Sequence, residues 1–149
     1  MFSGRFDHSI DDKGRVSIPA RFREALLQQG HDRMFVTNFI QGRERCLALY
    51  PPGEWETLVA RIKSRPAFDP LIQAFETFHV GGAHEVQVDR QGRILIPTRL
   101  RDFAHLERVV TFSALHDHFQ LWDKATLEKV LKTTEEQILD PAFFQKLNL

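Results

Sequence analysis

The sequence contains very little cysteine and no segment that resembles a membrane span. Cys46 is the single cysteine among 149 residues, which excludes an internal disulfide and fits a reducing compartment. No apolar run approaches the length that a membrane helix needs, and the first residues lack the apolar stretch of a secretion signal. We therefore expect a cytoplasmic protein with no membrane partner.

The chain also has no net charge, since 20 Lys and Arg residues balance 20 Asp and Glu residues. Many DNA-binding domains are strongly basic, because neutralising phosphates supplies much of their affinity. The charges are unevenly distributed, however. Residues 5–23 contain five basic residues against three aspartates, whereas residues 123–149 contain five acids against four lysines. A basic excess this small predicts weak nucleic-acid binding by one chain and useful binding only by several linked copies.

The sequence lacks the common motifs of catalysis and of metal binding. It has no Gly-x-Ser-x-Gly elbow, no P-loop, no Gly-x-Gly-x-x-Gly and no Cys-x-x-Cys. His116 and His118 would share one face of a strand, but no further ligands stand nearby at a spacing that completes a zinc site. Solvent-exposed loop histidines are the simpler interpretation, and His79 and His84 look like linker residues beside Gly81-Gly82. We expect no enzyme activity, no cofactor and no metal.

One motif occurs twice in the chain. Residues 11–23 (DDKGRVSIPARFR) align without a gap with residues 89–101 (DRQGRILIPTRLR), 78 positions later. Both copies read Asp-x-x-Gly-Arg, a short apolar strand, Ile-Pro and Arg-x-Arg. Residues 47–50 (LALY) match residues 119–122 (FQLW) more loosely, 72 positions later, so the loops of the first copy are about six residues longer. Two copies of one unit predict an internal pseudo-dimer.

Each copy predicts a turn, then a strand, then a helix. Asp11 and Asp89 can accept hydrogen bonds from the main chain ahead of them, and Gly14 and Gly92 can take a positive φ without strain. The residues that follow alternate between apolar and polar, as in a half-buried strand. Proline then ends the strand and suits the first turn of a helix.

The two turns place an arginine at the start of each strand, Arg15 in the first copy and Arg93 in the second. A lone arginine here would most simply cap a sheet edge or pair with a nearby aspartate. Because the same pattern occurs twice in the same register, a functional role for both arginines is the better interpretation.

Helices are predicted between and after the two copies. Apolar residues recur at helical spacing after Pro51-Pro52-Gly53 and again before Gly81-Gly82, and Asp123 is a good N-cap for a third helix. These apolar positions are Trp55, Leu58, Val59 and Ile62; Leu71, Phe75 and Phe78; and Leu127, Val130 and Leu131. Residues 141–147 are too few to fold alone, so they either dock or fray.

The repeated Asp-x-x-Gly-Arg-x-x-Ile-Pro, the opening Met1-Phe2-x-Gly4 and the segment Leu49-Tyr50-Pro51-x-x-x-Trp55 together resemble the MraZ family of bacterial transcriptional regulators. The resemblance extends from residue 1 to about residue 132. It implies an α+β fold in which two pseudo-symmetric SpoVT–AbrB-type halves, rich in β-structure, interleave swapped hairpins in one unit with flanking helices. The corresponding division of the chain is residues 5–52, a helical connector 53–80, residues 81–124, and a C-terminal helix and tail 125–149.

The resemblance also implies a function and an assembly. It implies sequence-specific binding of double-stranded DNA at short direct repeats upstream of the protein's own division and cell-wall operon, by a ring of eight or twelve chains at the nucleoid. Arg15 and Arg93 would contact guanine edges or phosphates, and Asp11, Gly14, Asp89 and Gly92 would hold the turns that aim them. Weaker phosphate contacts are expected from a second group of basic residues: Lys13, Arg90, Arg5, Arg21 and Arg23. Because the second copy has Gln91 in place of Lys13, we expect it to contribute less.

Two other classes of function remain open. An antitoxin-like module that binds a partner protein is possible because related single-copy domains bind both DNA and a toxin, but the tandem duplication and the lack of a long acidic tail count against it. A structural ring with no nucleic-acid role is favoured only by the neutral net charge.

Overall fold

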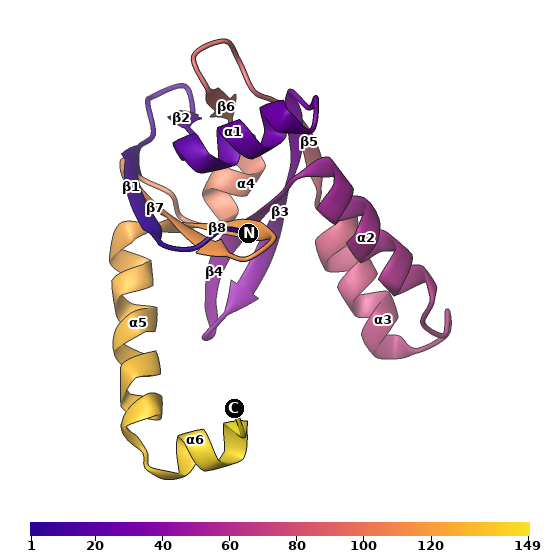
Figure 1. Ribbon diagram of the computed structural model, residues 1–149, viewed down its shortest axis with the longest axis vertical. Coiled ribbons are helices and arrows are strands. Elements are labelled where there is room, and N and C mark those ends of the chain that lie inside the picture. Colours follow the sequence, from indigo (N-terminus) through magenta and orange to yellow (C-terminus); the bar gives the residue numbers. More distant parts are fainter.

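Both copies of the repeat fold into the same succession of elements, and the computed structural model describes all residues 1–149 (Figure 1). The first copy forms β1 (Arg5–Ser9), β2 (Arg15–Ser17), α1 (Ala20–Gln28), β3 (Arg33–Gln41) and β4 (Glu44–Tyr50). The second copy forms β5 (His84–Gln87), β6 (Arg93–Leu95), α4 (Thr98–Phe103), β7 (Val109–Leu115) and β8 (His118–Asp123). The other helices are α2 (Pro52–Lys63), α3 (Pro70–Phe75), the π-helix η1 (Glu76–Val80), α5 (Lys124–Leu139) and α6 (Ala142–Leu147).

The two copies exchange strands. A six-stranded antiparallel sheet has the order β1-β7-β8-β4-β3-β5, so the first strand of each copy pairs with a strand of the other copy. The strands β2 and β6 form a separate two-stranded sheet with one strand from each copy. This exchange confirms the predicted α+β fold with two interleaved halves.

A pseudo-two-fold axis relates the halves, and the strand registers locate it. At the centre of the large sheet Ala48 pairs with Gln120, and these two residues are equivalent positions of the repeat. In the small sheet Val16 pairs with Ile94, which are also equivalent. The axis therefore passes through both sheets. Equivalent residues of β2 and β6 therefore lie at opposite ends of the small sheet.

One hydrophobic core joins the two sheets to α1 and α4. Phe22 of α1 and Leu100 of α4 occupy equivalent positions and have no accessible surface. The ring of Phe22 stacks against Phe119 of β8 and Phe2, with centroid distances of 4.6 and 5.4 Å. Val16 and Ile94 are also buried in this core. The core therefore fixes the small sheet, and with it the turns before β2 and β6, over the large sheet.

The connector forms an arm that projects from one side of the body (Figure 1). Trp55 of α2 is buried and stacks on Phe35 of β3 at 5.3 Å, and Ile62 is also buried, as the apolar spacing predicted. The second apolar stripe is only partly correct. Phe75 and Phe78 are half-buried, but Leu71, in the first turn of α3, is 79% exposed.

The π-helix places His79 in the core, which makes its interpretation as a linker residue wrong. The His79 side chain has no accessible surface. Its Nε2 lies 3.0 Å from the Tyr50 hydroxyl, its Nδ1 lies 3.1 Å from the Asn38 carbonyl oxygen, and its ring stacks on Phe75. Burial lowers the pKa of His79 from 6.5 to about 4, and burial also raises the pKa of Tyr50 to about 12. The imidazole is therefore neutral in the folded protein.

Acidification below pH 6.5 is expected to destabilise the protein through His79. Because its folded-state pKa of about 4 lies below its unfolded value of 6.5, the unfolded chain takes up the proton first. This contribution to the free energy of unfolding is complete above pH 6.5 and falls toward pH 4, with a slope of up to about 1.4 kcal/mol per pH unit. Urea denaturation between these pH values measures the slope. His79→Gln should flatten it and the exposed control His84→Gln should not; equal slopes for wild type and His79→Gln would contradict this account.

A second arm, formed by α5 and α6, leaves the opposite side of the body (Figure 1). Leu127 and Val130 of α5 pack against Cys46 and Trp122, as predicted from their spacing. Asp123 occupies the N-cap position but makes no capping hydrogen bond from its side chain, because its Oδ1 accepts instead from the Glu107 amide at 3.4 Å. The last residues form the short helix α6. No helix in the structure is both long enough and apolar enough to cross a membrane.

Candidate nucleic-acid interface

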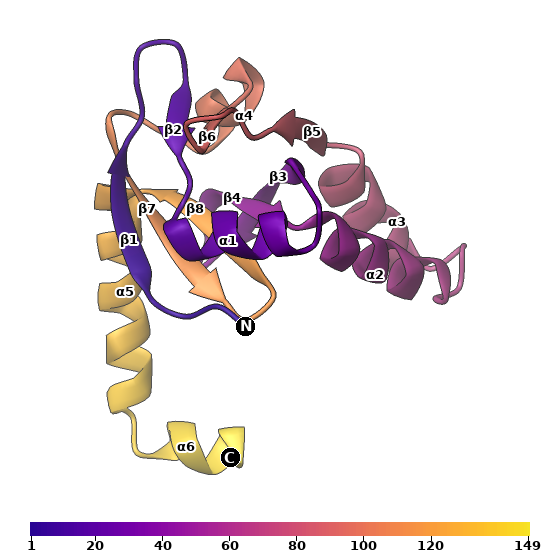
Figure 2. The ribbon, with the colours of Figure 1, turned by 45° about the horizontal axis from the view of Figure 1, so that its top comes forward.

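The two Asp-x-x-Gly-Arg turns lie at one end of the molecule, away from the far ends of both arms (Figures 1 and 2). They are linked through the small sheet. The Ile18 amide donates to the Gly92 carbonyl and the Ile96 amide donates to the Gly14 carbonyl, both at 2.9 Å. Each strand therefore continues until it bonds to the turn of the other copy. The two turns form one unit, although 78 residues separate their sequences.

In the first turn Asp11 bonds to the main chain and to Arg15. Its Oδ1 accepts from the amides of Lys13 and Arg15 at 3.0 and 2.9 Å, and its Oδ2 accepts from Arg15 Nε at 2.8 Å. The amide of Gly14 also donates to the Asp11 carbonyl at 2.9 Å. One carboxylate thus closes the turn and fixes the direction of the arginine.

The second turn repeats this geometry. Asp89 Oδ1 accepts from the amides of Gln91 and Arg93 at 2.8 and 2.9 Å, and Oδ2 accepts from Arg93 Nε at 3.0 Å. In both turns the pKa of the aspartate is lowered, mainly by the arginine backbone amide and further by the arginine side chain. Both carboxylates therefore lose their charge at a lower pH than an unperturbed aspartate does.

Of each arginine side chain, only Nε donates to the aspartate. The Nη atoms of Arg15 and Arg93 take part in no hydrogen bond within the protein, and the side chains are 37% and 32% exposed. A guanidinium held in this way is oriented by the protein and still has its outer donors available for an acceptor. A structural role and a DNA-binding role are therefore compatible for these two arginines.

Two further arginines cover the turns reciprocally. Gly14 and Gly92 have φ angles of +88° and +76°, and a Cβ added to either would lie within 3.0 Å of an arginine side chain. Arg101 of the second copy covers Gly14, and Arg23 of the first copy covers Gly92. Arg23 Nη2 also donates to the Arg90 carbonyl at 2.7 Å. Glycine is needed at both positions for its φ angle and for this close approach.

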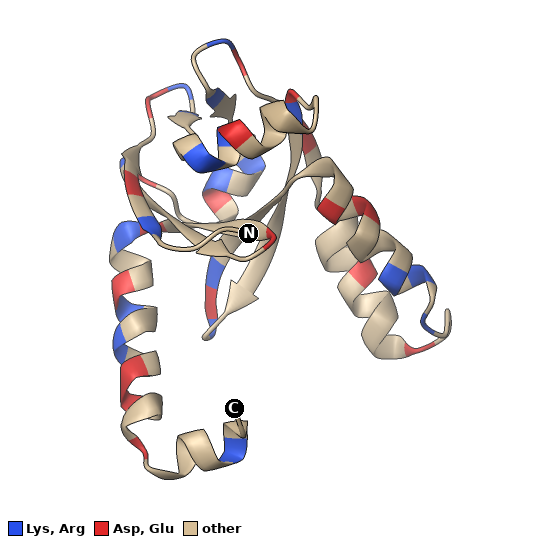
Figure 3. Ribbon diagram, viewed as in Figure 1, with Lys and Arg blue, Asp and Glu red and all other residues tan.

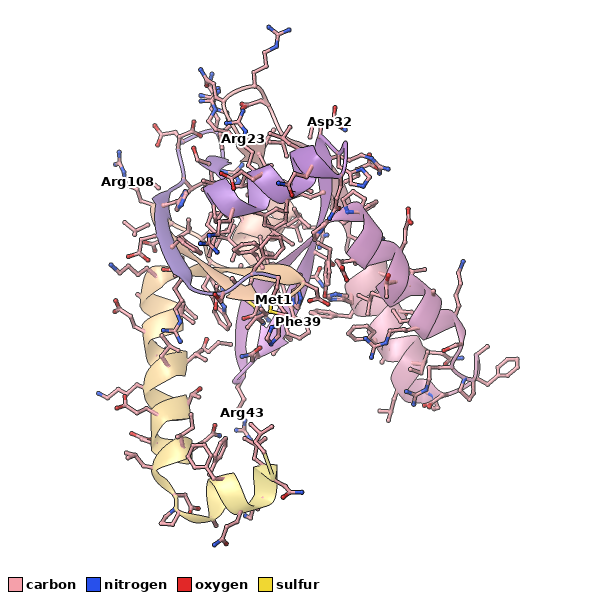
Figure 4. The ribbon with its side chains drawn as sticks, in the orientation of Figure 1. Met1, Arg23, Asp32, Phe39, Arg43 and Arg108 are labelled. Carbon is pink, nitrogen blue, oxygen red and sulfur yellow. The ribbon has the colours of Figure 1, made fainter.

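Arg23 was predicted as a phosphate contact, and the structure shows that its side chain also supports the second turn. In Figure 4 it lies at the end of the molecule that carries the turns. Arg101 was not identified from the sequence as a site residue. It occupies the position in the repeat equivalent to Arg23, 78 residues later, so the repeat itself contained the signal. Arg101 Nε donates to the Ile96 carbonyl at 3.1 Å, and its Nη2 donates to Thr98 at 2.9 Å.

Removing the Arg23 side chain is expected to destabilise the protein. Arg23→Ala loses the hydrogen bond to the Arg90 carbonyl and uncovers Gly92, which should lower the free energy of unfolding by about 1–2 kcal/mol. Arg21→Ala, two residues away and exposed, should change it by less than about 0.5 kcal/mol. Urea denaturation of the two variants gives the comparison. Equal stability of both variants would show that Arg23 does not support the turn.

The remaining predicted contacts are dispersed. Lys13 and Arg90 are exposed on the turns themselves. Arg5 begins β1, at the end of that strand away from the first turn, and Arg21 lies in the first turn of α1. Figure 3 shows acidic and basic segments together on both turns. The structure therefore groups Lys13 and Arg90 with the paired arginines, and leaves Arg5 and Arg21 outside that group.

The second turn carries the higher net charge of the two. Although Gln91 replaces Lys13, Arg90 replaces Asp12 at the preceding position. Residues 89–93 contain two arginines and one aspartate, for a net charge of +1, whereas residues 11–15 contain two basic and two acidic residues, for a net charge of 0. The charges therefore give no reason for a smaller contribution from Arg93.

The side chains of this chain do not form a cluster suited to binding a metal ion. The structure has no group of three or more His, Cys, Asp or Glu side chains placed to hold a metal ion. His118 Nδ1 lies 2.6 Å from Asp117 Oδ1, and its ring stacks on Tyr50 at 4.8 Å. His118 is half-buried at the start of β8, whereas His116 is exposed. The interpretation as exposed loop histidines is therefore correct for His116 and wrong for His118.

Comparison with known proteins identifies the family. A sequence model of the family described as "MraZ protein, putative antitoxin-like" matches residues 1–78 and 80–143, one match for each half. The chain belongs to the MraZ family. This membership and the two separate matches agree with the tandem repeat and with the interleaved fold.

Several relatives resemble the chain over most of its length. A protein of Thermomicrobium roseum is 44% identical over 82% of this chain and 81% of its own length. One of Acetivibrio thermocellus is 42% identical over 86% and 85%, and one of Roseiflexus castenholzii is 38% identical over 99% and 96%. Each is named "Transcriptional regulator MraZ". The names describe regulators, which confirms the expectation of a non-enzymatic family.

Proposed function

We propose that this protein is a sequence-specific DNA-binding regulator of transcription. The observation that carries the proposal is the pair of Asp-clamped arginines, Arg15 and Arg93, whose outer nitrogens remain unbonded at the same end of the molecule. Arginine bound through two donors to one guanine is the commonest specific contact in the major groove. The relatives' names point in the same direction. The site of action would then be the cytoplasm, at the nucleoid.

We infer that the target is a set of short direct repeats and that several chains bind it together as a ring. The net charge of zero makes one chain a weak DNA binder, so affinity has to come from linked sites. Subunits arranged head to tail all face the same way along the DNA, and such an array matches direct repeats rather than inverted ones. Regulation of the protein's own division and cell-wall operon belongs to the same proposal, as does a ring of eight or twelve chains.

Selection of bound fragments from random DNA tests the proposal. Repeated, guanine-containing sequences should be enriched, and the protein should be retained on a heparin column at low salt. Failure to enrich any sequence, together with no retention on heparin, would favour a structural ring without a nucleic-acid role.

A second candidate function is binding of a partner protein, which the words "antitoxin-like" in the family description favour. A basic toxin that purifies with the protein at fixed stoichiometry would support this second function.

The assembly is expected to form without DNA. Light scattering coupled to size exclusion at micromolar concentration should give a mass several times the 17.3 kDa of one chain. A monomer under these conditions would remove the gain in affinity from linked sites and contradict the proposed ring.

A further inference from the structure

The ends of the two arms expose large apolar side chains that nothing in the chain covers. Between α2 and α3, Phe68 is 91% exposed and Leu71 is 79% exposed. At the end of the other arm, Leu139 is 74% exposed and Phe144 is 60% exposed. The two arm ends lie far apart on opposite sides of the molecule, so they do not cover one another (Figure 1). Large exposed apolar side chains clustered in this way typically mark a binding surface.

The segment that presents Phe68 is held rigidly. We call residues 61–71 the tip. Asp69 Oδ1 accepts from the Leu71 amide at 2.9 Å, the Asp69 amide donates to the Pro66 carbonyl at 3.1 Å, and Gln73 Nε2 donates to the Ala67 carbonyl at 3.1 Å. These bonds on both sides of Phe68 fix the loop while leaving the ring outside it. A preorganised aromatic side chain loses little entropy when it binds.

The other arm carries a groove suited to receive such a side chain. Where α5 turns into α6, a groove of about 530 Å³ has Phe143 as its apolar component and Glu136 and Asp140 among its polar ones. Asp140 Oδ1 accepts from the Ala142 amide at 3.0 Å, which fixes the bend between the helices. The full lining is Thr133, Glu136, Gln137, Asp140, Phe143 and Lys146.

The charges of the tip and the groove are complementary. The tip has three basic residues and one aspartate, for a net charge of +2: Arg61, Lys63, Arg65 and Asp69. Residues 133–147, which form the bend and contain the whole lining of the groove, have three acids and one base, for a net charge of −2: Glu135, Glu136, Asp140 and Lys146. None of these residues is in a salt bridge within the chain, which has its ion pairs elsewhere. Opposite patches of this kind orient two surfaces as they approach.

We propose that the tip of one copy docks into the α5–α6 groove of the next copy, with Phe68 against Phe143 and the basic residues of the tip against Glu136 and Asp140. The two surfaces differ, so the contact is head to tail, and repetition of a head-to-tail contact gives a ring when the rotation closes. The arms also occupy equivalent places in the repeat, since α2 follows β4 and α5 follows β8. This inference rests on the ring in the proposed function and assigns its contact surfaces.

Light scattering of single-residue variants of the full chain tests the contact. Phe68→Ser should dissociate the assembly at protein concentrations at least about tenfold higher than wild type, because a central aromatic residue carries much of an interface's energy. Leu27→Ser is the matched control. Leu27 is 63% exposed on α1, outside both arms, and its loss should leave the mass unchanged. Thermal unfolding of the two variants should be the same in solutions dilute enough that both are monomeric, because assembly itself stabilises the folded chain.

A charge reversal provides the second measurement. Arg65→Glu should weaken assembly, and the double variant Arg65→Glu/Glu136→Arg should restore it to within about threefold of wild type, which a merely destabilised fold would not do. If wild type assembles while Phe68→Ser assembles equally well, or the double variant shows no recovery, the assigned contact is wrong and the ring remains. If wild type is itself a monomer, the ring fails together with the contact.

Discussion

Replacing Arg15 with alanine is expected to weaken specific DNA binding by at least about fivefold for each chain, and by more for the assembly, while folding persists. A lost bidentate contact to a base costs about 1–3 kcal/mol, and linked chains multiply the effect. The same substitution removes an ion pair to Asp11 whose partners are 37% and 40% exposed. An exposed pair of this kind contributes little to stability, because solvent screens it. Asp11 also keeps both main-chain donors, so the turn should survive.

Operator affinity, melting temperature and oligomer mass should be measured on the same set of variants. Arg93→Ala should lose about as much affinity as Arg15→Ala, since the second turn has equivalent geometry and the higher net charge. Lys132→Ala, exposed on α5, is the control for loss of one positive charge far from the turns. An Arg15→Ala protein that binds the operator like wild type would rule out its assignment as a DNA contact. Loss of stability and assembly along with binding would instead show that the arginine is only a structural clamp.

Salt and repeat number are expected to change operator affinity over several orders of magnitude. If an assembly makes six to ten phosphate contacts, raising monovalent salt from 50 to 200 mM should lower the affinity by about 10³–10⁵. A DNA fragment with two correctly spaced repeats should bind about 10²–10⁴ more tightly than a fragment with one repeat. Both effects follow from a neutral chain that gains affinity through assembly.

The Phe68→Ser variant separates the DNA affinity of a single chain from the gain in affinity that assembly adds. If it dissociates as proposed, it should bind a single repeat about as well as one wild-type chain and should lose the gain from a second repeat. Titrations of one-repeat and two-repeat fragments at two salt concentrations measure both effects. Affinity that does not respond to salt, or an assembled wild-type protein indifferent to repeat number, would contradict the collective mechanism.

The sequence predicted the fold because duplication makes long-range structure visible as local similarity. The alignment of residues 11–23 with residues 89–101 indicated a pseudo-two-fold axis, and the pairing of Val16 with Ile94 shows where that axis passes. The turns were also predictable. Asp-x-x-Gly is local turn chemistry, and each carboxylate binds residues two and four positions ahead.

Features that depend on tertiary contacts were missed. Arg101 covers a turn 87 residues earlier in the chain, and only the exchange of strands brings it there. His79 was interpreted from its glycine neighbours as a linker residue, but the π-helix turns it into an aromatic cluster contributed by β3, β4 and α2. Asp123 has the sequence of a good N-cap, but its carboxylate accepts instead from the amide of Glu107, on the loop before β7. In each case contacts with residues distant in the sequence, and not the neighbouring residues, determine where the side chain lies.

The most direct test of the central claim, that the paired turns read DNA sequence through Arg15 and Arg93, is selection from random DNA with wild type and with Arg15→Lys/Arg93→Lys. Lysine keeps the positive charge but lacks the planar fork that binds two acceptors at once. Wild type should enrich a repeated, guanine-containing sequence. The double lysine variant should assemble and bind heparin, yet enrich no sequence. Enrichment of the same sequence by both proteins would show that these two arginines do not read the DNA.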